Sequence, residues 1–272
     1  MIAYQNMYKV LKTIVVAGGL VLNAFRGNVQ NIPKESDLPP EKVRESSTAH
    51  TLVDDLVQEI ALEILYSHLP GISINVEEET SRREWFTSDK SGFCFHLDPL
   101  DGTLAYLRNS DGFAIGAGFS QDLEFIASAI YFPALDRLYY AEQGNGIRVQ
   151  TGSGNEIPFS RAGKAADKYI QKRCEDLLPV VQKMKLEPFE TMSAHHGMIA
   201  IAEGKARVDM YNMASPHDFG IPKVIVEEAG GICTDLAGKS IVFNAEFTRL
   251  PYFLAFFDEK TKEEFFSSQH QF

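Results

Sequence analysis

Cysteine is scarce in this sequence, and its few thiols stand far apart. The 272 residues include three cysteines, Cys94, Cys174 and Cys233, and no C-x-x-C pair. An odd number of widely spaced thiols favours a reducing compartment, where disulfides are rare. We therefore expect a cytoplasmic protein in which the cysteines are small core residues.

Basic residues are also in deficit. Lysine and arginine number 26 against 37 aspartates and glutamates, which gives a formal net charge of −11. A protein that binds a nucleic-acid polymer needs a basic face, so we expect no such partner. The deficit does not exclude a phosphorylated small molecule, because a bound metal ion reverses the local sign of an acidic pocket.

No apolar run is long enough to predict a membrane span. The longest uncharged stretch near the start, residues 13–25, is too short to cross roughly 30 Å of hydrocarbon. Lys9 and Lys12 precede it as they would in a signal peptide, but no small-x-small cleavage site follows. We interpret the stretch as part of a buried first helix and expect no membrane partner.

The pattern of apolar residues predicts a layered α/β protein with two joined halves. Helices are expected at residues 6–26, 52–65, 193–203 and 218–229, and strands at 72–76, 93–97, 113–119, 125–132 and 137–141. The polar residues 27–50 predict a long loop or a mobile flap. Strands dominate the first predicted half, 1–160, and helices alternate with single strands in the second, 161–272.

The most specific signal for chemistry is the hexapeptide Asp98-Pro99-Leu100-Asp101-Gly102-Thr103. A buried strand delivers Asp98, and Pro99 bends the chain at once, so both aspartates can face one point. Gly102 allows a close backbone approach to a ligand. A helix that starts near Thr103 would offer free N–H groups to a phosphate. An ordinary Asp-rich turn would explain an isolated Asp-Gly-Thr, but the full hexapeptide after a buried strand is much rarer.

Other acidic groups permit two interpretations each. Glu77-Glu78-Glu79 follows a predicted strand, where a metal would be a natural reason to gather carboxylates, although the cluster taken alone favours a solvated acidic loop. Asp54-Asp55 could simply complement a helix dipole, and Asp218 could be an N-cap.

Several familiar catalytic patterns are missing. His195-His196 and His217 invite a metal interpretation, but adjacent helix residues point to different faces and no H-E-x-x-H spacing occurs. There is no G-x-S-x-G elbow and no cysteine in a nucleophile motif. The glycines between residues 144 and 154 precede no helix of a dinucleotide fold and predict hairpin turns.

Four spaced motifs resemble the inositol monophosphatase family of lithium-sensitive, magnesium-dependent phosphatases over most of the chain. The family's D-P-[I/L]-D-G-T motif is complete at residues 98–103, and its E-E-[S/T] element resembles Glu78-Glu79-Thr80. Its T-x-x-D position falls on Asp55. Its W-D-x-A-[A/G] element and the later E-A-G-G correspond to residues 217–221 and 228–231, and its G-[S/T]-x-A helix to residues 193–204.

The resemblance implies a layered αβαβα sandwich of the sugar-phosphatase type that holds two or three Mg²⁺ ions. The implied metal ligands are Glu78, Asp98, the carbonyl of Leu100, Asp101 and Asp218. Thr103, oriented by Asp55, would position and help to deprotonate the attacking water, with Glu78 as a further catalytic residue. The implied substrate contacts are Asp101, Gly102, Thr103, Ser193, Ala194 and Asp218. The first half would then carry the metal motifs and the second would complete the site.

The resemblance leaves the substrate open. Inositol monophosphate is the first expectation, and a 3′(2′),5′-bisphosphate nucleotide or fructose 1,6-bisphosphate is the alternative. Tyr211 falls near the position of a substrate-binding acid, His217 replaces a tryptophan, and Met192 replaces a glycine. A regulatory protein that acts through protein contacts is the non-enzyme alternative. A homodimer is also expected, with the aromatic-rich strands between Phe113 and Tyr140 as a possible interface.

Overall fold

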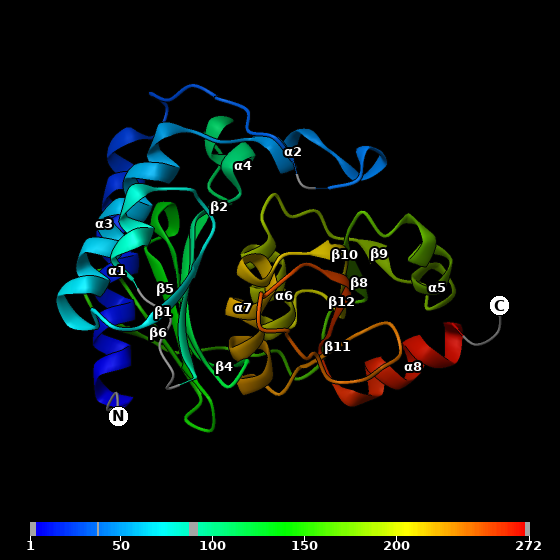
Figure 1. Cartoon of the computed structure of the whole chain (residues 1–272). Coiled ribbons are helices and arrows are strands. Elements are labelled where there is room, and N and C mark those ends of the chain that lie inside the picture. The colour runs from blue at the N-terminus through cyan, green and yellow to red at the C-terminus, as the bar shows by residue number, and fades with distance from the viewer. Residues whose placement is uncertain (1–3, 37, 87–91, 270–272) are drawn as a thin grey trace.

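The computed structural model describes residues 4–36, 38–86 and 92–269. It consists of five layers, in which helices and sheets alternate (Figure 1). Helices α1 (Tyr4–Phe25) and α3 (Leu52–His68) form one outer layer. A seven-stranded sheet, two central helices, a five-stranded sheet and a second outer pair of helices follow. The predicted αβαβα sandwich is confirmed.

The first sheet follows the order of the chain from β1 to β7. Its strands are β1 (Ser73–Val76), β2 (Phe93–Asp101), β3 (Ala114–Gln121), β4 (Glu124–Phe132), β5 (Arg137–Glu142), β6 (Ile147–Gln150) and β7 (Glu156–Ile157). Strand β1 pairs in parallel with β2, and every later pair is antiparallel. The five predicted strands are all present, and the predicted turns at Gly144 and Gly154 fall between β5, β6 and β7.

The outer layer explains the apolar stripe near the start of the chain. Helix α1 buries one face against α3 and the first sheet, through Met7, Val10, Leu11, Ile14, Val15 and Leu22. Among the described helices, α1 has the length and the apolar composition of a helix that crosses a membrane. These two properties are weak evidence for a membrane span, because the core helix of a soluble protein shares them. Its burial agrees with the predicted first core helix.

The second sheet has the strand order β11-β12-β10-β8-β9. Its strands are β8 (Lys168–Lys172), β9 (Glu187–Pro188), β10 (Val208–Ala214), β11 (Ile232–Thr234) and β12 (Leu250–Phe256). Helices α5 (Leu178–Lys183) and α8 (Glu259–Gln269) cover its outer face. The first sheet ends before residue 160 and the second begins after it. The predicted division into two joined halves, 1–160 and 161–272, stays a prediction.

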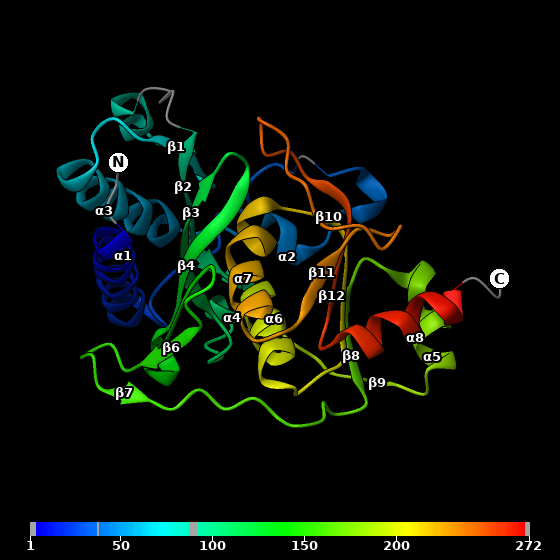
Figure 2. The same ribbon diagram turned by 90° about the horizontal axis from the view of Figure 1, so that it is seen from below.

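Helices α6 (Ala194–Glu203) and α7 (Pro216–Glu228) fill the space between the two sheets (Figure 2). Both helices are buried over most of their length, and their side chains join those of both sheets in one core. The three cysteines are free and buried, as predicted. The central position of α6 and α7 brings their first turns to the end of β2, where the acidic hexapeptide lies (Figure 1).

Short elements connect these layers. They are α2 (Glu45–Thr48), α4 (Thr103–Leu107) and the 3₁₀ turns Pro40–Lys42, Ser81–Trp85, Pro133–Leu135 and Glu175–Leu177. The described residues of the segment 27–50 are mostly irregular, as predicted. Two backbone hydrogen bonds join its two ends, from Ile32 N to His50 O (2.8 Å) and from Lys34 N to Thr48 O (2.9 Å). Its mobility stays a prediction.

The suggested dimer interface is wrong in one respect. The aromatic side chains of the strands between Phe113 and Tyr140 lie inside the protein and are at most 5% exposed: Phe113, Phe119, Phe125, Tyr131, Phe132, Tyr139 and Tyr140. They pack against the helices on both faces of the first sheet and are not available to a partner. A homodimer itself stays a prediction.

The glycine pair in α1 serves close packing. A Cβ atom on Gly18 would lie 2.4 Å from Ile115 Cδ1, and one on Gly19 would lie 2.4 Å from the ring of Tyr131. Each distance is shorter than van der Waals contact, so a larger residue would push the helix away from the sheet. The two glycines lower helix propensity, but they let α1 approach the sheet closely.

We expect Gly19→Val to lower the free energy of unfolding by about 2 kcal/mol, because an overpacked core typically costs about 1–3 kcal/mol. The matched control is Ala24→Val, on an exposed position of the same helix. It should cost only the difference in helix propensity, about 0.5 kcal/mol. Urea unfolding of both variants measures the difference, and equal losses would show that the close approach at Gly19 is unimportant.

Candidate active site

The end of strand β2 places two aspartates in a buried turn. Asp98 and Asp101 are 1% and 5% exposed. The turn orients the first of them, because Leu100 N donates to Asp98 Oδ1 (3.1 Å). Gly102 follows with φ of +81°, a left-handed conformation that glycine adopts without strain. A Cβ atom there would also lie 2.7 Å from Ser193 Cβ, so the first residues of α6 approach this turn closely.

Asp101 accepts the free N–H groups at the start of α6. Ala194 N donates to Asp101 Oδ1 (2.9 Å) and His195 N donates to Asp101 Oδ2 (2.8 Å). Ser193 caps the same helix, since its Oγ accepts from His196 N (3.2 Å). The family resemblance predicts that Ser193 and Ala194 contact the substrate. The structure shows that the Ala194 amide is already engaged by Asp101, and the substrate contact stays a prediction.

Three carboxylates from two elements converge at this point. Asp98 and Asp101 come from β2, and Asp218 comes from the first turn of α7. Each offers an oxygen atom within 4.8 Å of the others. Such a set of carboxylate oxygens is what Mg²⁺ prefers in proteins, and few other groups would compensate three adjacent negative charges. The residues therefore fit a divalent cation, as the predicted ligand set requires.

The proximity of these acids changes their affinity for protons. Burial, followed by the charges of Glu77 and Asp101, holds the pKa of Asp98 well above its usual range. Burial, followed by the charges of Asp101 and Glu77, raises the pKa of Asp218 to about 6. Like charges at short range and loss of water both disfavour the ionised form. A cation at this place would relieve both effects.

His195 lies against the same carboxylates, which the sequence did not predict. Its side chain is fully buried, with Nδ1 3.6 Å from Asp101 Oδ2 and Nε2 3.9 Å from Asp98 Oδ2. Its Nε2 also lies 3.2 Å from the carbonyl oxygen of His217. A Cβ atom on Gly116 would fall 2.2 Å from the ring, so strand β3 makes room for it with a glycine.

The acid that faces Thr103 is Asp54. Thr103 Oγ1 lies 3.2 Å from Asp54 Oδ1 and 3.1 Å from the carbonyl oxygen of Leu100. The second Asp54 oxygen accepts from Thr51 N (2.9 Å) and Thr51 Oγ1 (2.7 Å). The predicted contact between Thr103 and Asp55 is therefore wrong. Successive helix residues point about 100° apart, so only one of two adjacent aspartates can face the turn.

Of the two adjacent glutamates Glu77 and Glu78, only one adjoins the aspartates. Besides burial, the charge of Glu77, the residue before the predicted ligand Glu78, raises the pKa of both Asp98 and Asp218. Lys34 reaches both glutamates, with Nζ 2.8 Å from Glu77 Oε1 and 2.5 Å from Glu78 Oε1. Burial alone would raise the pKa of Glu77, but Lys34 and His217 lower it. Burial, followed by the charge of Glu77, raises the pKa of Glu78. Glu77 is thus the glutamate that adjoins the three aspartates.

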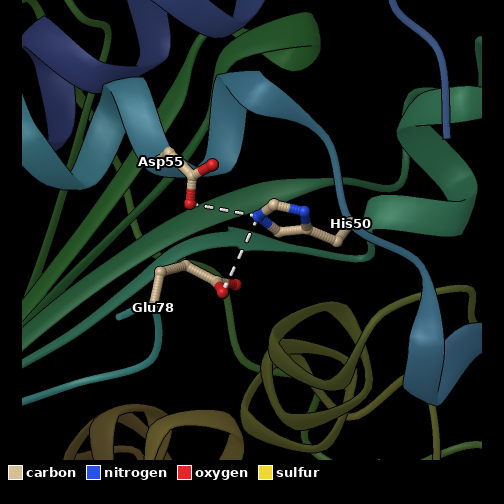
Figure 3. Close-up of side chains that lie close together, drawn as sticks. All are labelled: His50, Asp55 and Glu78. Atoms are coloured by element: carbon tan, nitrogen blue, oxygen red, sulfur yellow. Dashed lines mark hydrogen bonds and ion pairs between the residues drawn. The ribbon is translucent and has the colours of Figure 1, made fainter. Parts of the chain in front are cut away.

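Asp55 and Glu78 belong to a neighbouring group. The ring of His50 lies between their carboxylates, with Nε2 3.1 Å from Asp55 Oδ1 and 3.8 Å from Glu78 Oε2 (Figure 3). These three residues could also hold a metal ion by geometry. The ammonium group of Lys34 already binds one Glu78 oxygen. The metal and catalytic roles predicted for Glu78 stay predictions.

One of the missed residues had a usable signal in the sequence. The segment Thr51-Leu52-Val53-Asp54 matches the T-x-x-D pattern, and its first and last residues form a capping box at the start of α3. Lys34, Glu77 and His195 had no comparable signal. Their place in the site depends on how segment 27–51 and helix α6 pack, which neither spacing nor periodicity reveals.

The comparison with known proteins agrees with this geometry. The sequence model of the inositol monophosphatase family matches residues 3–263. The chain belongs to the inositol monophosphatase family. It is therefore a hydrolase that acts on phosphate monoesters, and the family's dependence on metal is consistent with the cluster of carboxylates.

Individual relatives are distant and differ in substrate. The chain is 24% identical over 233 residues to a fructose-1,6-bisphosphatase/inositol-1-monophosphatase of Thermotoga maritima, with 81% of each chain covered. It is 25% identical over 240 residues to a histidinol-phosphatase of Chlorobaculum parvum, with 85% of each covered. The structure of the extragenic suppressor protein suhB from Bartonella henselae superposes with a TM-score of 0.75 at 19% identity, covering 96% of this chain and 97% of that one.

We expect Mg²⁺ affinity to rise and the stability of the metal-free protein to fall as the pH is raised from about 5 to about 8. Burial raises the pKa of Asp54 to about 7 and that of Asp218 to about 6, against about 4 in an unfolded chain. The folded state therefore holds more protons than the unfolded state over this range, so deprotonation lowers its stability. A cation competes with the same protons.

Calorimetric Mg²⁺ titration and thermal unfolding in EDTA measure the two effects. The control is Asp54→Asn, which removes the proton that leaves at about pH 7. In this variant the fall in melting temperature between about pH 6 and pH 8 should be smaller. A metal affinity that does not depend on pH would contradict the assignment of these acids to a cation site.

Proposed function

We propose that this chain is a Mg²⁺-dependent phosphomonoesterase that hydrolyses a small phosphate ester by in-line attack of water on phosphorus. The observation that carries the proposal is the convergence of Asp98, Asp101 and Asp218 at the buried end of β2. Three adjacent carboxylates in a family of phosphatases serve a cation that faces a phosphate. A regulatory role without catalysis would not require this set.

The chain's own residues would hold two adjacent cations. Asp98, Asp101 and Asp218 lie close together, and the charge of Glu77 acts on Asp98 and Asp218, so these four carboxylates would hold the cations. The carbonyl of Leu100 lies in the same turn and completes an all-oxygen set. Mg²⁺ bound there would supply Lewis-acid chemistry, by neutralising phosphoryl charge and lowering the pKa of water.

Thr103 and Asp54 are placed to move a proton. The Thr103 hydroxyl can donate to Asp54 Oδ1 and so accept a proton from an attacking water on its own oxygen. Thr51 holds the other oxygen of Asp54 by two hydrogen bonds, which fixes the carboxylate toward Thr103. Asp54 is 2% exposed, so bulk water does not compete for this contact.

Further properties are part of the proposal. The expected substrate is a small phosphorylated molecule, with inositol monophosphate as the expectation from sequence. Lithium sensitivity, a cytoplasmic location and a homodimer are also expected. The variety of substrates in the names of the relatives supports the reaction class and leaves the leaving group open.

We expect turnover to require Mg²⁺ and to be lost in excess EDTA. Asp98→Asn should abolish turnover, because it removes a charge that would serve both cations, and Asp218→Asn should lower kcat by at least about 100-fold. Asp235→Asn is the control, since it changes the same charge in a turn outside the site. Phosphate release from a panel of monoesters measures the effect. Full activity in EDTA would refute the metal mechanism.

Thr103→Ala and Asp54→Asn should each lower kcat by roughly 10²–10⁴-fold, the usual contribution of general-base assistance. The double variant should be little worse than either one, because the two residues act as a unit. Asp55→Asn is the matched control on the same helix, and its effect on kcat should be much smaller. Steady-state kinetics with Mg²⁺ titrations decide the matter. A larger loss from Asp55→Asn than from Asp54→Asn would overturn the assignment.

A further inference from the structure

The side chain of His195 forms part of the wall around the carboxylate cluster. It is the second residue of α6, directly after Ala194, whose amide binds Asp101. The side chain is fully buried, and its two nitrogens lie near two of the three carboxylates. Nδ1 is 3.6 Å from Asp101 Oδ2, and Nε2 is 3.9 Å from Asp98 Oδ2. A cation held by these acids would therefore have an imidazole beside it.

The hydrogen bond of Nε2 decides which nitrogen of the ring carries a proton. Nε2 lies 3.2 Å from the carbonyl oxygen of His217, and a carbonyl oxygen can only accept. Nε2 is therefore the donor, and in the neutral ring Nδ1 then carries the lone pair. Histidines that bind a metal are usually held in this way, with the other ring nitrogen donating to a carbonyl or a carboxylate.

The lone pair of Nδ1 has nothing to accept. Among the described residues, no group forms a hydrogen bond with His195 Nδ1. The carboxylate oxygen nearest to it in the cluster, Asp101 Oδ2, is also an acceptor, at 3.6 Å. Two buried acceptors that face each other are costly unless a cation or a proton lies between them. The separation suits a shared ion, because ligand distances of about 2.0–2.2 Å let two ligands of one ion lie up to about 4.2 Å apart.

The surrounding backbone holds the ring in this position. A Cβ atom on Gly116 of strand β3 would lie 2.2 Å from Cε1 and 2.9 Å from Nδ1 of His195, so a larger residue there would displace the ring. On the other side, His195 N donates to Asp101 Oδ2 (2.8 Å). Turning Nδ1 away from Asp101 would break the bond from Nε2 to the His217 carbonyl. The unpartnered nitrogen is therefore fixed toward the acids.

We propose that His195 Nδ1 is a ligand of the cation beside Asp101, so that this position takes a transition-metal ion such as Zn²⁺ or Co²⁺ in preference to Mg²⁺. The proposal rests on the proposed function, because it assumes that the carboxylate cluster holds cations. Imidazole nitrogen suits Zn²⁺ and related ions, whereas Mg²⁺ prefers oxygen ligands. A second cation near Glu77 would keep oxygen ligands only and would remain Mg²⁺.

The test variant is His195→Gln, because the glutamine amide can keep the donor to the His217 carbonyl while the Nδ1 lone pair is lost. Its affinity for Co²⁺ should fall at least about 10-fold, which is the usual scale for a lost contact at a metal site. Its affinity for Mg²⁺ should change much less. Calorimetric titration of the metal-free protein with each ion alone measures both. A rise in affinity for both ions would instead show that His195 is a cation that balances Asp101, and would overturn the proposal.

The matched control is His50→Gln. It removes an imidazole from the neighbouring group, where His50 lies between Asp55 and Glu78. The ratio of Co²⁺ affinity to Mg²⁺ affinity should stay unchanged in this variant. A ratio that falls in His50→Gln and not in His195→Gln would place the transition metal in the other group and refute the assignment to His195.

X-ray absorption of the protein with one equivalent of Zn²⁺ gives a readout that needs no turnover. Scattering from a bound imidazole should appear in the unaltered protein and in His50→Gln, and should be absent in His195→Gln. The first two samples decide the matter even if His195→Gln does not fold. Scattering from oxygen ligands alone in the unaltered protein would overturn the proposal.

Phosphate release with Mg²⁺ keeps this inference separate from the proposed function. Absence of hydrolysis of every phosphate ester, with the imidazole signal of His195 intact, would refute the proposed function and leave the ligand assignment standing. Hydrolysis by a protein whose Zn²⁺ has only oxygen ligands would refute the ligand assignment alone.

Discussion

The two hydrogen bonds between Asp101 and the first turn of α6 hold the active site together. Asp101 ends a strand of the first sheet, whereas α6 belongs to the layer between the sheets. Backbone N–H groups at a helix start carry a partial positive charge and otherwise have no partner. They therefore stabilise a buried carboxylate, and they fix how the two halves of the chain approach each other. The positions of Asp98 and Asp218 relative to one another follow from that approach.

Bringing several buried acids together costs free energy, and the surrounding residues offset part of this cost. Lys34, from the irregular segment before α3, binds both Glu77 and Glu78. Burial lowers the pKa of His217 to about 4, so its ring adds no charge at neutral pH. What remains is a net negative centre, which a divalent cation would compensate.

Membership of the family defines the class of reaction and not the substrate. The family model matches residues 3–263, whereas the relatives are named for different substrates, as a fructose-1,6-bisphosphatase/inositol-1-monophosphatase and a histidinol-phosphatase.

Much of this architecture was predictable from the sequence alone. The helical stripes of α1 and α3, the alternating strands and the hexapeptide 98–103 each report on local geometry, because side-chain direction repeats with a fixed period in helices and strands. They determined the layered fold, the family and the reaction class. Only the tertiary structure decided which of two adjacent acids faces the site, at Asp54 and at Glu77, since neighbouring residues point in different directions and packing selects one. It also decided that Asp101 meets the start of α6, because packing joins segments that no sequence spacing relates.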